Sequence, residues 1–117
     1  MYQSLYAEMS EGTNAVARDN ERAAFGKAVA LLRAAQASGP VSRDAIEALL
    51  YVNRLWSVLL EDLAHPDNGL PVKLKADLIS IGIWMLRQAD ELRQGRAADF
   101  QSLIDISEAI RGGLGPS

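Results

Sequence analysis

Apolar residues recur with helical spacing in four segments, which cover about residues 13 or 20 to 37, 42–63, 71–94 and 98–111. In the first segment, Phe25, Val29 and Leu32 follow the i, i+4, i+7 spacing that places one apolar stripe on a helix. No segment alternates apolar and polar residues in the way that indicates a half-buried strand. The pattern predicts an all-α fold, a compact single-domain helical bundle of about four helices.

Residues that end or begin helices separate these segments. Residues 38–40, Ser-Gly-Pro, end the first helix, because Gly accepts the left-handed cap and Pro cannot continue the helix. Ser42 can then cap the second helix. Residues 65–69, His-Pro-Asp-Asn-Gly, form a turn in which Pro fixes φ and Asn-Gly accepts a positive φ. Pro71 suits the first turn of the third helix, and Gly95 follows its end.

A chain of 117 residues can bury a core as one domain. We expect the helical bundle at residues 13–112, an N-terminal tail at residues 1–12 and a C-terminal tail at residues 113–117. Apolar residues make up 49% of the chain, yet no apolar run approaches the length of a membrane span. The first residues also lack the charged and apolar regions of a signal peptide. We therefore expect a cytoplasmic protein.

The third segment has the broadest apolar surface. On a wheel of ~100° per residue its apolar residues form two ridges. The first ridge comprises Leu74, Leu78, Ile81, Met85 and Leu92, and the second Ile79, Ile83 and Leu86. Gly82 and Ala89 lie between the ridges, where a neighbouring backbone could approach closely. An arc this wide predicts contact with at least two other helices, so we expect this helix to be the central one.

Trp84 interrupts the polar face of the same helix, between Ser80 and Arg87. An N-terminal or loop segment could cover this ring. Alternatively, Trp84 is an aromatic anchor for a partner, with Ser80 and Arg87 as its polar rim.

The second segment shows the opposite anomaly, a polar residue within an apolar arc. The arc comprises Leu49, Val52, Trp56, Leu59, Leu60 and Leu63, and Asn53 falls inside it. We expect Trp56 to lie in the core. Asn53 either bonds a chain end or loop carbonyl, or makes a specificity contact in a groove. On the other side, Tyr51, Leu55 and Val58 interrupt the charges, and this strip suits a partner helix or packing from the first helix.

The composition argues against several kinds of chemistry. The chain has no Cys and one His, which excludes disulfides and thiolate nucleophiles and leaves too few ligands for a conventional zinc site. No phosphate-binding loop, dinucleotide fingerprint or nucleophile elbow occurs. The net charge of −3 disfavours direct RNA binding, because no basic stripe stands ready to displace counterions. We expect a non-enzymatic protein without a cofactor or metal.

Several of these residues also carry a resemblance to a known family, the bacterial flagellar biosynthesis regulator FlaF. The chain is similar to that family in the order and spacing of Asn53-Arg54-Leu55-Trp56, Pro66-Asp67-Asn68, Leu70-Pro71, Leu74, Ile79-Ser80, Trp84, Asp99-Phe100 and Leu103-Ile104-Asp105-Ile106. Residues 42–114 match well and the first helix more loosely. The family often carries a second basic residue before Leu-Trp, where this chain has Asn53 and then Arg54 alone, and often an Asn at the position of Ser107.

The resemblance implies a cytoplasmic, non-enzymatic protein needed for flagellin production and export. Its members look like flagellin-specific export chaperones or regulators that act alongside the flagellin regulator FlbT. One hypothesis is therefore a chaperone that sheathes an amphipathic helix of flagellin. The alternative is a regulator that acts mainly through contact with FlbT. In either case, we expect the partner-binding residues to be Asn53, Arg54, Leu55, Ser80, Trp84 and Arg87.

Overall fold

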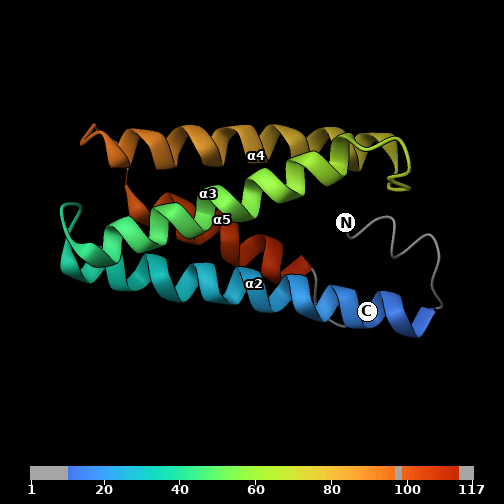
Figure 1. Ribbon diagram of the computed structural model, residues 1–117, viewed down its shortest axis with the longest axis horizontal. Coiled ribbons are helices and arrows are strands. Elements are labelled where there is room, and N and C mark those ends of the chain that lie inside the picture. Colours follow the sequence, from blue (N-terminus) through green and yellow to red (C-terminus); the bar gives the residue numbers. More distant parts are fainter. Residues whose placement is uncertain (1–10, 97–98, 114–117) are drawn as a thin grey trace.

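The computed structural model describes residues 11–96 and 99–113, with side chains from residue 20 onward. Within these residues the chain forms the helices α2 (Glu11–Ser38), α3 (Arg43–Ala64), α4 (Val72–Arg93) and α5 (Phe100–Gly113) (Figure 1). The prediction of an all-α bundle is confirmed. Residues 11, 12 and 113, which we expected in the tails, are helical. The rest of the predicted tails, residues 1–10 and 114–117, lies outside the described residues.

The first helix connection follows the predicted chemistry. Gly39 has a φ of +98°, the left-handed conformation that Gly adopts without a steric penalty. Ser42 caps α3, because its Oγ accepts a hydrogen bond from the Ala45 N–H at 3.1 Å. The same hydroxyl donates to the Gly39 carbonyl at 2.7 Å. Gly95, after α4, has a φ of +74°, as its predicted position requires.

The loop between α3 and α4 contains the predicted turn, in which the Asn68 N–H donates to the His65 carbonyl at 3.0 Å. The expected positive φ is absent. Among the described residues positive φ values occur at Gly39 and Gly95, and neither Asn68 nor Gly69 adopts one. Instead, the Asn68 side chain is buried and folds the loop. Its Nδ2 donates to the Asp62 carbonyl, and its Oδ1 accepts from the Leu70 N–H, both at 3.1 Å. These side-chain hydrogen bonds add to the backbone hydrogen bond of the turn and connect the end of α3 to Leu70.

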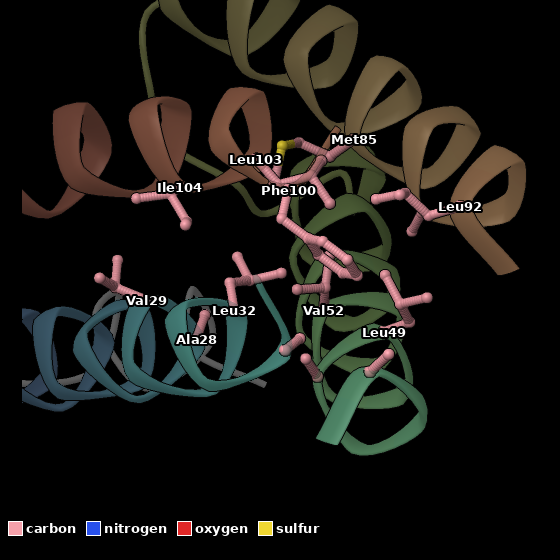
Figure 2. Close-up of a cluster of buried hydrophobic side chains, with 14 of the residues drawn as sticks. Ala28, Val29, Leu32, Leu49, Val52, Met85, Leu92, Phe100, Leu103 and Ile104 are labelled. Atoms are coloured by element: carbon pink, nitrogen blue, oxygen red, sulfur yellow. The ribbon is translucent and has the colours of Figure 1, made fainter. Parts of the chain in front are cut away.

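The core lies where α2, α3 and α5 meet, and α4 closes one side of it. In Figure 2, Val29 and Leu32 from α2, Val52 from α3 and Leu103 from α5 point toward one another. Trp56 is fully buried, as predicted, and its ring meets that of Phe25 edge to face at 5.7 Å between centroids. Small residues at the helix contacts let the backbones approach closely; these are Ala28, Ala35, Ala45 and Ala48.

The prediction that the third helix is central is wrong. α4 packs chiefly against α3 and touches α5 lightly, whereas α2 packs extensively against both α3 and α5. Figure 1 shows α4 along one edge of the bundle and α2 along the opposite edge, with α3 crossing obliquely between them. The first ridge of α4 carries the buried Met85 and Leu92, but Ile83 on the second ridge is exposed. The apolar arc of α4 is therefore wide, but other helices cover only part of it.

Gly82 is a point of tight contact between α3 and α4. A Cβ atom at this position would lie 2.8 Å from Trp56 Cε3 and 2.8 Å from Leu60 Cδ2. The close approach at Gly82 is made by side chains of α3, so the expectation of a neighbouring backbone at this position is wrong. Toward the N-terminus of α3 the two helices diverge (Figure 1).

Within the described residues, no helix is both long and apolar enough to cross a membrane.

Candidate functional site

The divergence of α3 and α4 leaves a groove of about 440 Å³. Its walls are mostly apolar and come from both helices: Pro40, Ala45, Ile46, Leu49, Leu50, Asn53, Ala89, Asp90 and Arg93. Two large aliphatic side chains on its α3 wall face solvent, with Ile46 67% and Leu50 50% exposed. A soluble protein gains nothing in stability from such residues, so this surface suggests contact with another molecule.

Helical periodicity places the α3 wall. Ile46, Leu50 and Asn53 are spaced i, i+4, i+7, so they lie on one face of α3. Leu49, one residue before Leu50, turns inward and is buried in the core. The sequence reasoning missed Ile46 and Leu50 as candidates. An i, i+4 pair of large aliphatic residues outside the core arc was the available signal.

The α4 wall continues onto the outer surface of that helix. A shallow depression of about 550 Å³ is lined by Ile83, Leu86, Arg87, Gln88, Asp90, Glu91 and Arg96. Asp90 belongs to both the groove and the depression, so the two surfaces are continuous. Together they form one surface over α3 and α4, which we call the α3–α4 groove.

Asn53 lies in this groove and not in the core. Our expectation that it sits within the buried arc is wrong, because its side chain is exposed. The structure records no hydrogen bond to this amide from the described residues. Of the two readings that the sequence left open, this placement corresponds to a polar group in the wall of a groove.

Trp84, Ser80 and Arg87 lie on the outer face of α4, as the wheel predicted. All three side chains are exposed, and the described residues leave 37% of Trp84 accessible to solvent. The N-terminal segment that we considered as a cover, residues 1–10, lies outside the described residues.

The other two predicted partner-binding residues separate from each other. Arg54 is exposed on α3, whereas Leu55 is half-buried and packs against the core, away from the groove. Tyr51 also packs against the core, and the Lys27 Nζ of α2 lies 5.1 Å from its ring centroid. The strip on this side of α3 is therefore largely covered by the first helix, with Val58 left exposed.

Most charged groups around the groove are paired with each other. Arg93 pairs with Asp90, and Arg96 donates to Glu91 Oε2 at 2.8 Å. The latter hydrogen bond raises the pKa of Arg96 above its already high value, so this side chain stays cationic. These pairs are exposed and contribute little to stability.

Potential metal ligands are scattered over the described residues. None of their His, Asp and Glu side chains forms a group of three that could hold a metal ion. The Nδ1 of His65 accepts the Asp67 N–H at 3.1 Å, which gives this side chain a role in the loop. The arrangement supports recognition of an apolar surface.

Comparison with protein families matches residues 2–114 to the family described as flagellar protein FlaF. The chain belongs to the FlaF family. Comparisons with curated proteins and with solved structures gave no match. The family assignment therefore covers nearly the whole chain, including the first helix, and both walls of the α3–α4 groove lie within it.

Proposed function

We propose that this FlaF-family protein is a flagellin-binding export chaperone that holds an amphipathic helix of flagellin in the α3–α4 groove. By covering the apolar face of that helix in the cytoplasm, it keeps the subunit soluble and supports flagellin synthesis and export. Family membership supports the flagellar role. The exposed Ile46 and Leu50 in a groove between two helices support helix-in-groove recognition.

The proposal needs no catalytic step, metal or cofactor. Binding would bury the aliphatic side chains of the groove, and burial of apolar surface contributes about 25 cal/mol per Å². Trp84 lines neither the groove nor the outer depression, so its exposed ring, with Ser80 and Arg87 beside it, would add a separate aromatic contact on the outer face of α4.

The direct test is to titrate the purified protein with flagellin and, separately, with FlbT, and to follow complex formation by calorimetry. We expect a stoichiometric complex with flagellin. Ile46→Glu should weaken it about tenfold or more, because a carboxylate would then face the apolar side of the bound helix. Val58→Glu is the matched control, since Val58 is an exposed aliphatic residue of α3 outside the groove.

A second variant tests the aromatic contact. Trp84→Ala should weaken flagellin binding while the helicity and melting temperature stay close to those of the wild type. If the loss of melting temperature accounts for the loss of binding, Trp84 has a structural role only. If FlbT binds and flagellin does not under any mixing order, the chaperone proposal fails and a regulator that acts through FlbT replaces it.

A further inference from the structure

Nearly all lysine and arginine side chains in the described part of the chain have a partner. Lys73 pairs with Asp77, Arg33 with Glu108 and Arg43 with Glu47. The remaining paired cations are Arg22, Lys27, Lys75, Arg93, Arg96 and Arg111. Within residues 20–96 and 99–113, Arg54 and Arg87 are the cations without a recorded hydrogen bond, ion pair or ring contact.

These two arginines border the α3–α4 groove on opposite sides. On a wheel of ~100° per residue, Arg54 falls beside the stripe of Ile46, Leu50 and Asn53, on the side away from α4. Arg87 falls beside Ile83 of α4, on the side away from α3, and it lines the outer depression. An apolar strip thus lies between two unpaired positive charges.

Both arginines also lie at the same level along the groove. α3 and α4 run antiparallel (Figure 1), and they are in close contact where Gly82 meets Trp56 and Leu60, a place we call the crossing. Arg54 precedes that crossing by about one helical turn, and Arg87 follows it by about one turn. Because the helices are antiparallel, both steps lead in the same direction, toward the open end of the groove.

We propose that the groove selects its occupant by charge and takes an amphipathic protein helix whose apolar stripe is bordered by carboxylates on both sides. Asp or Glu residues on the two borders of that helix pair with Arg54 and Arg87, while its apolar residues cover Ile46 and Leu50. Asn53, in the groove wall, supplies a hydrogen-bonding group that favours one register. This inference rests on the proposed function and names the chemistry that the bound helix must have.

The groove also has a polarity along its length. Glu61, likewise without a recorded partner among the described side chains, lies two turns beyond Arg54, past the crossing with α4. The bound helix fits in one direction only if its acidic borders lie at the level of the arginines and a basic or neutral residue lies near Glu61. The reverse direction brings its carboxylates toward Glu61, where like charges repel.

Charge reversal at the two arginines tests the inference on flagellin itself. Arg54→Glu and Arg87→Glu should each weaken binding about three- to tenfold, and the effect should shrink at high salt. Lys73→Glu is the control, because it changes the net charge equally at the far end of α4. The inference fails, and the proposed function stands, if flagellin binds all three variants as tightly as it binds the wild type.

Designed peptides test the inference without flagellin. Three helical peptides share one apolar stripe and carry Glu, Gln or Lys on its borders, and their binding to the wild-type protein is measured by fluorescence anisotropy. The expected order of affinity is Glu, then Gln, then Lys, and it should reverse for the Arg54→Glu, Arg87→Glu double variant. If this order holds although flagellin does not bind, the charge preference stands and the flagellin proposal fails.

Two further outcomes would overturn the inference. The first is equal or tighter binding of the Lys-bordered peptide by the wild-type protein. The second is a concentration-dependent dimer, seen by analytical ultracentrifugation, that Ile46→Glu abolishes and that the peptides do not displace. In that case a second copy of the chain occupies the groove.

Discussion

Two buried polar side chains show how differently single residues serve this fold. Asn68 satisfies its amide with the Asp62 carbonyl and the Leu70 N–H, and its own carbonyl accepts from Lys75 Nζ at 3.0 Å. Ser107 on α5 is only 1% exposed, and its hydroxyl has no hydrogen-bond partner among the described residues. Asn68 therefore stabilises the loop, whereas the Ser107 hydroxyl is buried at a net cost.

Replacing Asn68 should destabilise the protein. Asn68→Ala removes both side-chain hydrogen bonds across the loop, one to the Asp62 carbonyl and one from the Leu70 N–H. We therefore expect the free energy of unfolding to fall by about 1–3 kcal/mol. Urea denaturation measures this change. Asp67→Ala, at the exposed neighbouring position, should change it by less than about 0.5 kcal/mol. Equal effects at the two positions would show that the hydrogen bonds of Asn68 do not hold the loop.

Replacing Ser107 should stabilise the protein. Ser107→Ala removes a buried hydroxyl without a partner and adds helix propensity, so the free energy of unfolding should rise by about 1 kcal/mol. The exposed Ser57→Ala on α3 gains propensity alone, about 0.5 kcal/mol. Thermal melting compares the two variants. A loss of stability in Ser107→Ala would mean that the hydroxyl has a partner in solution.

At the scale of elements, the crossing of α3 and α4 determines both the packing and the groove. Gly82 lets the Trp56 ring and Leu60 come against the α4 backbone, and beyond this point the helices diverge. The divergence exposes Ile46 and Leu50 of α3, which α4 would otherwise cover. The close contact at Gly82 and the open groove therefore both result from the angle at which α3 and α4 pack.

A pair of glycine substitutions isolates this contact. Gly82→Ala should lower the free energy of unfolding by about 1–2 kcal/mol, because overlap with the rigid Trp56 ring outweighs the propensity gain of about 1 kcal/mol. Gly26→Ala, in α2, should raise it by about 0.5–1 kcal/mol, since the nearest atom is the Arg111 Nη1 at 3.4 Å on a flexible side chain. Chemical denaturation of both variants provides the measurement. Stabilisation by both would contradict the tight crossing.

At the scale of the whole molecule, all four helices contribute to the core, but α4 packs chiefly against α3 alone. α2, α3 and α5 contribute Phe25, Leu32, Trp56 and Leu103, while α4 contributes Met85 and a few neighbours through one side. α4, which contacts the other helices less than α2, α3 or α5 do, also forms one wall of the α3–α4 groove. Such an element can adjust to a partner at a lower cost than a central helix could.

Hydrogen exchange should reveal this hierarchy. We expect backbone amides of α4 to exchange through an opening of lower free energy than those of Leu32 in α2 or Leu103 in α5, because fewer tertiary contacts hold α4. Native-state exchange in increasing denaturant, followed by NMR, separates the two openings. Identical opening energies in all helices would instead describe a single cooperative unit.

Local chemistry was readable from the sequence where neighbouring residues decide the outcome. The helical periods of Phe25, Val29 and Leu32, the Ser42 cap and the Gly95 terminus depend on residues within one or two turns, and all appear as predicted. The position of Trp84 on an outer face followed from the same periodicity. The burial of Asn68 was not predicted, because a turn motif does not show whether a side chain points inward.

The sequence by itself determined the helices, their ends, most of the core and, through residues 53–56 and 66–84, the family. Tertiary structure alone decided which apolar faces are covered. Periodicity reports the face on which Ile83 or Asn53 lies, but burial depends on how far apart two helix axes run, and that distance is set by contacts such as Gly82 against Trp56. The exposed groove, and the placement of Arg54 and Arg87 along its borders, are consequences of that packing.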